Sequence, residues 1–266
     1  MTAGPVRVAR DGVVFVVEPD WSDAREIQFW NAYAQGWERD TLAAIAEFLP
    51  PGGVHLDIGA WIGPTLLFAA ARAREAYGFE PDPAAFAKLR RNVALNPALA
   101  ARIRIKRAAL WIRDADLSFA VSAPGDSTTS AMLRQGEVPA LTAPAFDARG
   151  PAIAPLLARA DFVKMDIEGA EFDLVPHIAD LLAVRRPALH LSFHAHRLDK
   201  TDPAAWAAKQ RACVAALACY PRVLAWDEGA WRDISDERDV AYERALSRGG
   251  LEASLLYTAS GPSASA

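Results

Sequence analysis

The stretch from Val54 to Thr65 constrains the fold of this chain more than any other. Val54–Ile58 is a short apolar run that follows the breaker Pro50–Gly53, and it leads into a turn with glycines at positions 59 and 63. Beyond the turn, apolar residues recur at helical spacing. A strand, a tight glycine turn and a helix in this order bring backbone N–H groups and a helix N-terminus up to a ligand. The stretch therefore predicts an α/β fold with a ligand site at the turn.

Strand and helix patterns alternate after this stretch. Capping and apolar spacing predict helices from Asp82 to Asn96 and over Phe172–Leu182 and Pro203–Cys219. The predicted strands are Tyr77–Glu80, Ile103–Ala108, Asp161–Asp166, Ala188–Phe193, Val223–Trp226 and Leu255–Thr258, with Leu117–Val121 as a strand or one arm of a hairpin. This alternation predicts a Rossmann-like, mostly parallel sheet with helices on both faces.

The chain divides into three parts by pattern. Residues 1–50 read as a hairpin around Asp11-Gly12 followed by two helices, a cap or lid on the domain. Residues 51–260 read as one α/β domain, and residues 261–266 as a mobile polar tail. Within the domain, Ser122–Gly150 is rich in small and polar residues, so we expect a loop-rich segment there, with one strand near Leu141.

Composition excludes some classes of protein. The net charge is −4, from 29 basic and 33 acidic residues, and this balance gives no sign of a nucleic-acid surface. We find neither an apolar run long enough for a membrane span nor a leader peptide. The two cysteines, Cys213 and Cys219, lack metal-binding spacing and read as reduced thiols. We therefore expect a soluble, cytoplasmic protein.

The turn after the first strand carries the first candidate ligand residues. Gly59 permits a close backbone approach, and Gly63 lets the helix sit near the strand. Asp57 stands where a nicotinamide-binding fold would usually have a glycine that leaves room for a pyrophosphate. A carboxylate there suits a cationic ligand. Asp57, Gly59, Ala60 and Gly63 are thus candidate cofactor residues.

Glu80 ends the next predicted strand, about twenty residues further on. An acidic side chain at that position typically binds the ribose hydroxyls of an adenosine cofactor. Pro81 follows it directly. The end of the third strand, at Ala109 and Leu110, would then lie beside the adenine.

The run Lys164–Glu171 is the least ordinary part of the sequence. Asp166 falls at the carboxyl end of a strand, where ligands bind in open α/β sheets, and Glu168 and Glu171 could face the same point. Three carboxylates could hold a hard cation such as Mg²⁺, or one could act as a base whose pKa is raised by the others. His194 falls near the end of the fifth strand and is a candidate general base or metal ligand.

Aromatic residues are dense between Trp21 and Trp37. Packing over the core is the more common use of such residues, and a wall or lid over a substrate is the alternative. Trp37, Glu38 and Trp61 are the candidates for that wall or lid.

These motifs together resemble the FkbM family of S-adenosylmethionine-dependent, class I methyltransferases. The resemblance rests on four runs and the Trp37-Glu38 pair, the runs being Asp57–Gly63, Phe79–Asp82, Leu89–Asn92 and Lys164–Glu171. It implies a seven-stranded sheet and methyl transfer, usually to a hydroxyl group of a sugar, polyketide or other secondary metabolite. It also implies that the glycine loop and Asp57 hold the methionine part of the cofactor, that Glu80 holds the ribose, and that Asp166 and its neighbours line the reacting centre.

The hypothesis that follows is an O-methyltransferase acting on a small molecule, with Asp166 or His194 taking the hydroxyl proton directly or through a metal-bound acceptor. Two alternatives stay open. A nucleotide-dependent oxidoreductase is disfavoured by Asp57 and by the missing Gly-x-Gly-x-x-Gly, and a non-catalytic binding module would be expected to lack cofactor residues that are present here. The acceptor, metal dependence, oxygen against nitrogen methylation and oligomeric state are not readable from the sequence.

Overall fold

The computed structural model describes residues 4–120, 131–132, 141–195, 202–240, 242 and 253–259. Its strands are β1 (Val6–Arg10), β2 (Val13–Val17), β3 (Val54–Ile58), β4 (Glu75–Phe79), β5 (Ile103–Lys106), β6 (Ala109–Trp111), β7 (Ala115–Ala120), β8 (Ala131–Met132), β9 (Leu141–Asp147), β10 (Phe162–Met165), β11 (Ala188–Phe193), β12 (Arg222–Asp227), β13 (Ala230–Asp233) and β14 (Ala253–Thr258). Its helices are α1 (Ala24–Gln35), α2 (Arg39–Phe48), α3 (Pro64–Ala70), α4 (Pro83–Ala94), α5 (Pro97–Ala100), α6 (Ala154–Leu157), α7 (Glu171–His177), α8 (Ala179–Arg185) and α9 (Pro203–Leu217), with a 3-10 turn at Ser235–Glu237.

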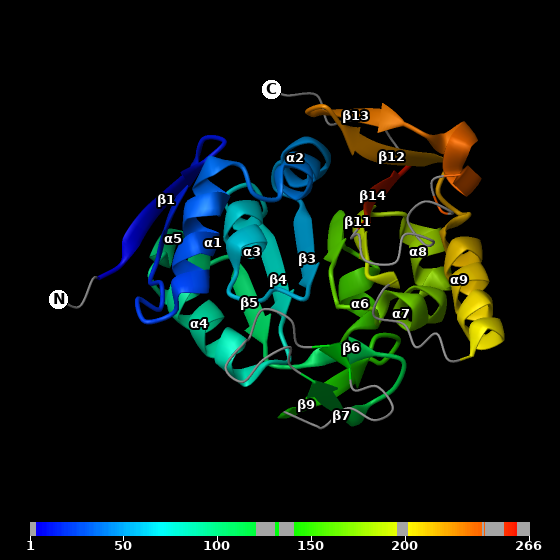
Figure 1. Cartoon of the computed structure of the whole chain (residues 1–266), viewed down its shortest axis with the longest axis horizontal. Helices are drawn as coiled ribbons and strands as arrows, with labels where there is room; N and C mark the ends of the chain where they lie inside the picture. Colours follow the sequence, from blue (N-terminus) through cyan, green and yellow to red (C-terminus); the bar gives the residue numbers. More distant parts are fainter. Residues whose placement is uncertain are drawn as a thin grey trace.

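A central sheet organises the molecule (Figure 1). Among the described residues it has eight strands in the order β13-β12-β14-β11-β10-β3-β4-β5. The five strands from β11 to β5 run parallel, and β14, β12 and β13 join antiparallel to their neighbours. The predicted α/β, mostly parallel architecture is therefore confirmed. The parallel strands end together at one edge, which is where such folds bind ligands.

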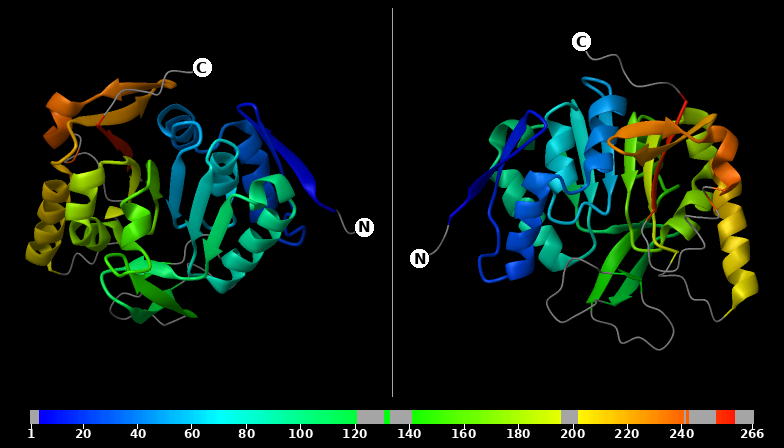
Figure 2. Two further views of the ribbon diagram at one scale, coloured as in Figure 1. Left: turned by 180° about the vertical axis from the view of Figure 1, so that it is seen from behind. Right: turned by 45° about the horizontal axis from the view of Figure 1, so that its top comes forward.

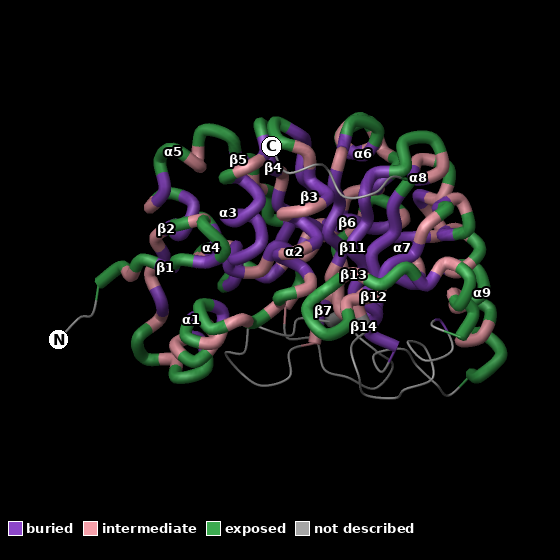
Figure 3. The backbone as a smooth tube through the Cα atoms, turned by 90° about the horizontal axis from the view of Figure 1, so that it is seen from above, coloured by how far each residue is buried: buried purple, intermediate pink, exposed green. Residues whose placement is uncertain are grey.

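Alternate residues of the strands feed two separate hydrophobic clusters, one on each face of the sheet. On β14, Leu255 and Tyr257 belong to one cluster and Leu256 to the other, as the two-residue period requires. Helices α6 to α9 cover the first face, and α1 to α4 cover the second (Figure 2). In Figure 3 the central strands are buried, and the outer helix α5 is exposed. Covering both faces explains why β3, β10 and β11 are buried along their whole length.

Local sequence signals explain where several elements begin. Asp11 and Gly12 both have positive φ, of 47° and 80°, and form the two-residue turn between β1 and β2. Asp23, Asp82 and Asp202 cap α1, α4 and α9 through side-chain bonds to backbone N–H groups. The N-terminal hairpin and helices pack into the same cluster as α3 and α4, through residues such as Phe15, Trp30 and Leu42.

Three features differ from the sequence-based expectation. The central sheet has eight strands among the described residues where the resemblance implied seven, because Ala230–Asp233 pairs with β12 as an edge strand. Phe172–Leu182 is two helices where one was predicted, since Pro176 inside α7 lacks a backbone N–H and the chain turns at Ile178. A second sheet, in the order β6-β9-β7-β8, was not foreseen as a unit.

Parts of two predictions fall outside the described residues. The loop-rich segment Ser122–Gly150 is described only at 131–132 and from 141 onward, where β9 confirms the strand near Leu141. The tail 261–266 also lies outside them. Of the helices that the structure describes, none has a stretch long and apolar enough to cross a membrane.

Candidate active site

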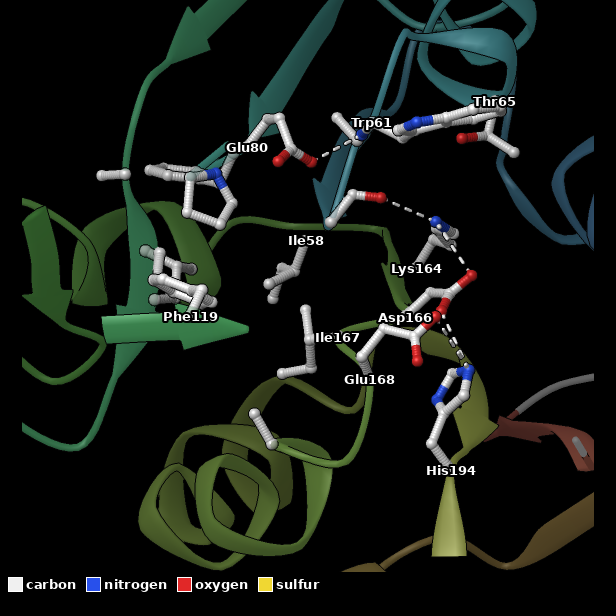
Figure 4. Close-up of a pocket in the computed structure, with 18 of the residues that line it drawn as sticks. Ile58, Trp61, Thr65, Glu80, Phe119, Lys164, Asp166, Ile167, Glu168 and His194 are labelled. Carbon is white, nitrogen blue, oxygen red and sulfur yellow. Dashed lines mark hydrogen bonds and ion pairs between the residues drawn. The ribbon is translucent and has the colours of Figure 1, made fainter. Parts of the chain in front are cut away.

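A cavity of about 390 Å³ opens at the carboxyl ends of the parallel strands. Its lining comes from the ends of β3, β4 and β10, from residues after β11, from the link between α1 and α2, and from the second sheet. Figure 4 shows that the side chains divide into two groups. Glu80 and Phe119 lie on one side, whereas Lys164, Asp166, Glu168 and His194 gather on the other. Most of the predicted site residues thus meet in one place, at the predicted edge of the sheet.

The glycine turn after β3 forms one wall of this cavity. Gly59 has a φ of +85°, and a Cβ added there would lie 1.9 Å from the backbone oxygen of Asp166. Only glycine permits this backbone conformation and this contact together. The N–H groups of Gly59 and Ala60 both donate to the carbonyl of Phe79, which ties the turn to β4. Gly63 does not line the cavity, and instead begins α3 with a φ of +95° against Leu89.

Asp57 lies beneath the cavity and does not line it. Its side chain is fully buried, accepts a hydrogen bond from Thr65 Oγ1 at 2.6 Å, and has Lys164 Nζ 3.5 Å from its Oδ1. Burial alone would raise the pKa of Asp57, but the charge of Lys164 and contacts with His55 and Thr65 outweigh it and lower the pKa. In this structure Asp57 is therefore a buried anion that fixes Lys164 and the start of α3.

Lys164 joins the glycine turn to the acidic side of the cavity. Its Nζ donates to the carbonyl of Gly59 at 2.9 Å and lies 3.5 Å from Asp166 Oδ2. Burial would lower the pKa of Lys164, but Asp57, Asp166 and Glu38 together raise it above its usual range. The sequence did not indicate the bond from Lys164 to the turn, since that bond depends on β3 and β10 being neighbours.

Glu80 projects into the cavity from the end of β4. Its two oxygens accept backbone hydrogen bonds from Trp61 at 2.9 Å and from Asp82 at 2.8 Å. Burial raises the pKa of Glu80 to about 7, although these two N–H groups oppose the shift. Pro81, Ala109 and Leu110 line the cavity beside it, as predicted from their positions after β4 and β5. The carboxyl group has lone pairs left for hydroxyl groups of a ligand.

His194 and Glu171 form a buried pair below Asp166. Glu171 Oε1 lies 2.8 Å from His194 Nδ1, and the Glu171 carboxylate also accepts from the N–H groups of Ile167 and Gly169. His194 Nε2 lies 3.5 Å from Asp166 Oδ1 and 4.0 Å from Glu168 Oε1. Burial alone would lower the pKa of His194, but Glu171 and the other carboxylates raise it to about 10. His194 is therefore a cation at neutral pH, and the hypothesis that it acts as a general base does not fit this arrangement.

We predict that this histidine makes the stability of the protein depend on pH. Its folded pKa exceeds its unfolded value of about 6.5, so its contribution is fully present below that pH and is lost as the pH rises toward about 10. Chemical denaturation at about pH 7 and about pH 9.5 should show that His194→Gln costs less stability at the higher pH, by about 1 kcal/mol or more. An equal cost at both pH values would contradict a protonated His194.

The predicted arrangement of three carboxylates around a metal is not what the structure shows. Among the described residues, the group with ligand atoms close enough for one ion, within 4.8 Å of one another, is Asp166, Glu171 and His194. Glu171 does not line the cavity, and its oxygens are engaged by two backbone N–H groups and by the histidine. Mg²⁺ prefers near-octahedral oxygen ligands. The donor set therefore does not fit Mg²⁺, because one of its three members is a histidine nitrogen donor and that histidine is already bonded to a second member, Glu171.

Aromatic side chains form the wall nearest the N-terminal helices. The cavity is lined here by Phe29, Trp37 and Trp61. The rings of Phe29 and Trp61 pack edge to face, with their centroids 4.5 Å apart. Trp30 and Tyr33 are instead buried in the core. Within the aromatic run, some rings thus pack in the core and others line the cavity.

The second sheet supplies an apolar wall that sequence reasoning missed. Trp111, Leu117 and Phe119 line the cavity from β6 and β7. The alternation of Leu117 and Phe119 was a signal that both face the same way. It could not show which way, because that depends on how the second sheet packs against the first.

Comparisons with known proteins add to this geometry. The family model described as Methyltransferase FkbM domain matches residues 57–213. A solved structure of a methyltransferase FkbM from Methylobacillus flagellatus KT is 16% identical over 88% of this chain and 55% of that chain, with a TM-score of 0.42. This chain thus spans little more than half the length of that protein.

Two further solved structures are similar over more of their own length. A SAM-dependent methyltransferase from Agrobacterium tumefaciens is 13% identical over 98% of this chain and 72% of that chain, with a TM-score of 0.45. TYW2 of M. jannaschii, solved in complex with AdoMet, is 14% identical over 97% of this chain and 86% of that chain, with a TM-score of 0.42. A comparison with curated protein sequences gave no match.

Proposed function

This chain belongs to the FkbM family of methyltransferases, and from that premise we propose that it transfers a methyl group from S-adenosylmethionine to a hydroxyl group of a small molecule such as a sugar, a polyketide or another secondary metabolite. The observation that carries the proposal is the two-sided cavity. One side, around Glu80 and Phe119, is apolar apart from a single carboxyl group, and the other holds Lys164, Asp166 and Glu168.

The residues present fit such a donor. Pro81, Leu110 and Phe119 offer an apolar slot for an adenine ring, with Glu80 beside it to accept hydrogen bonds from ribose hydroxyls. The turn at Gly59 and Ala60, which leads into α3, would hold the methionine part. Asp57 supports this turn from below through Lys164 and Thr65, and does not itself line the cavity.

When bound, S-adenosylmethionine supplies an electrophilic methyl group on a positively charged sulfur. The protein must then hold an acceptor in line, exclude water and receive a proton from the acceptor. The aromatic wall of Phe29, Trp37 and Trp61 would exclude water and give sugar or ring faces a surface to stack against.

Within this proposal, Asp166 is the residue that receives the hydroxyl proton. It lines the cavity, is half-buried, and lies 3.5 Å from both Lys164 and His194. Lys164 fixes it relative to the glycine turn, and the His194 cation, held from behind by Glu171, fixes its other oxygen. Because His194 already carries a proton at neutral pH, it would position Asp166 and not take the proton itself.

Calorimetry tests the function directly. The protein should bind S-adenosylhomocysteine, the product form of the donor, and should not bind NAD. Binding of NAD without binding of S-adenosylhomocysteine would contradict the proposal and favour the oxidoreductase alternative. Binding of S-adenosylhomocysteine without transfer of a labelled methyl group to any hydroxylated acceptor would favour a non-catalytic binding module.

The assignment of Asp166 predicts a loss of turnover without a loss of donor binding. Asp166→Asn keeps the size of the side chain but removes a proton acceptor, so kcat should fall at least about 100-fold. The affinity for S-adenosylhomocysteine should stay within a few-fold, as measured by calorimetry on the same preparation. Full turnover by Asp166→Asn on an accepted substrate would remove the residue from this role.

A further inference from the structure

Glu38 carries a carboxyl oxygen that is buried without a partner. It lies in the link between α1 and α2 and lines the cavity. Its Oε1 accepts a hydrogen bond from Trp37 Nε1 at 3.1 Å. Its Oε2 is closed off from solvent and, within the part of the chain that the structure describes, accepts no hydrogen bond. Buried polar atoms are normally paired, so an unpaired one at a cavity wall suggests that a ligand supplies the partner.

Neighbouring carboxyl groups of the site already have partners within the protein. Glu80 accepts hydrogen bonds from two backbone N–H groups, and Asp57 accepts one from the hydroxyl group of Thr65. Asp166 lies between the cations of Lys164 and His194. Glu38 differs from Glu80 and Asp166, because one of its oxygens is engaged and the other is not. Asp57 Oδ1 also accepts no hydrogen bond, but it lies 3.5 Å from the cation of Lys164.

The charges around Glu38 leave room for one more cation. Lys164 is the positive group that acts on the pKa of Glu38, and its Nζ already lies 3.5 Å from carboxylate oxygens of both Asp57 and Asp166. The negative charges of Asp166 and Asp40 raise the pKa of Glu38. The charge of Glu38 in turn raises the pKa of Tyr33. Burial is the main cause that raises the pKa of Glu38 to about 7, with Lys164 opposing the shift. At neutral pH the group therefore carries a proton part of the time.

We infer that Glu38 binds the positively charged part of the methyl donor, and that this cation pairs with Oε2, the carboxyl oxygen that accepts no hydrogen bond from the described residues. The inference rests on the proposed function and names a donor contact that Asp57, buried below the cavity, does not make in this structure. Glu38 lines the same cavity as the glycine turn, and Lys164 donates a hydrogen bond to that turn at the carbonyl of Gly59. When the cation enters, the proton on Glu38 leaves to solvent, since a carboxylate and not a carboxylic acid pairs with a cation.

The test is calorimetry of Glu38→Gln with S-adenosylmethionine and with S-adenosylhomocysteine. The variant should bind S-adenosylmethionine about 10-fold to 100-fold more weakly, as expected for a lost charge-assisted contact. The second ligand separates the two cations of the donor, because it keeps the α-ammonium group and lacks the sulfonium. A loss confined to S-adenosylmethionine assigns the contact to the sulfonium, and an equal loss for both assigns it to the ammonium group.

Proton release gives a second readout that does not depend on turnover. Titrations in two buffers of different ionisation enthalpy count the protons released on binding near about pH 7. Wild type should release more protons than Glu38→Gln, and what remains in the variant should come from Glu80, whose pKa is also about 7. The affinity of wild type should rise between about pH 6 and about pH 8 more steeply than that of the variant.

Glu228→Gln is the matched control. Glu228 also has a left-handed backbone, with a φ of +47° against +51° for Glu38, but it is exposed in the turn between β12 and β13. It should bind both ligands like wild type. Glu38→Asp, which keeps the charge, should bind more tightly than Glu38→Gln if charge is what matters, and thermal unfolding of every variant shows whether it is folded.

The outcomes separate the inference from the function beneath it. A folded Glu38→Gln that binds both ligands with wild-type affinity and proton release overturns the inference and leaves the proposed function standing. A wild-type protein that binds neither ligand overturns the proposed function and the inference with it.

Discussion

Replacing Gly59 with alanine is expected to destabilise the protein by about 3 kcal/mol or more and to abolish donor binding. A left-handed backbone costs an L-residue about 1–2 kcal/mol. The added Cβ would also lie 1.9 Å from the carbonyl oxygen of Asp166, which is backbone and cannot rotate away. Relieving that overlap means moving β3 from β10, and such overpacking typically costs about 1–3 kcal/mol more. The glycine turn and Asp166 would separate, and both walls of the cavity would shift.

Gly12→Ala isolates the cost of the backbone conformation. Gly12 has a φ of +80°, close to the +85° of Gly59, but a Cβ there would meet nothing within 4 Å. This control should lose only about 1–2 kcal/mol. Urea denaturation measures both variants, and calorimetry with S-adenosylhomocysteine follows the cavity. Equal losses in the two variants would show that contact with Asp166 does not constrain the turn.

The sequence alone predicted the elements whose signals are local. The Asp11-Gly12 turn, the cap at Asp82 and the strand–turn–helix at Val54–Thr65 each depend on residues a few positions apart, and the structure confirms all three. The placement of Glu80 and Asp166 at one edge also followed, because parallel strands end on the same side. For these residues, a pattern and one rule of topology were sufficient to place them.

Residues whose surroundings come from distant parts of the chain could not be placed in this way. His194 falls near Asp166 by strand order, but its bond to Glu171 depends on the turn after β10, where Glu168 and Gly169 both have positive φ. That bond changes the histidine from a candidate base into a cation. Asp57 was likewise predicted to face the ligand, and only the pairing of β3 with β10 shows that Lys164 lies above it.

The second sheet was missed for a different reason. Two of its strands, β6 and β8, have only three and two residues, and β9 carries Pro144, which cannot donate to a ladder and weakens the strand pattern. The parallel pairing of β6 with β9 joins residues more than thirty positions apart, so no local signal marks it. The periodicity of the sequence could therefore not predict that Phe119 forms part of an apolar wall of the cavity.

Removing the charge of Lys164 is the second change for which we expect a large effect. Lys164→Met keeps the length of the side chain but leaves Asp57 as a buried carboxylate without its nearest cation. Breaking a buried ion pair by removing one partner typically costs about 3–5 kcal/mol. The carbonyl of Gly59 loses a hydrogen-bond donor at the same time. Urea denaturation of this variant should therefore show one of the largest losses of stability of any single substitution in the chain.

Two further variants show whether the cost comes from the stranded charge. Adding Asp57→Asn to Lys164→Met removes that charge and should recover part of the loss, with a coupling energy of about 0.5–3 kcal/mol. Lys209→Met breaks a pair with Asp173 at 2.6 Å that is exposed to solvent, and should cost at most about 1 kcal/mol. Lys164 lowers the pKa of Asp57, so without it the carboxyl group can take a proton more easily. The difference in the free energy of unfolding between Lys164→Met and the double variant should then shrink as the pH falls toward about 4. A difference that does not change with pH would show that the packing of Lys164, and not its charge, is what the fold requires.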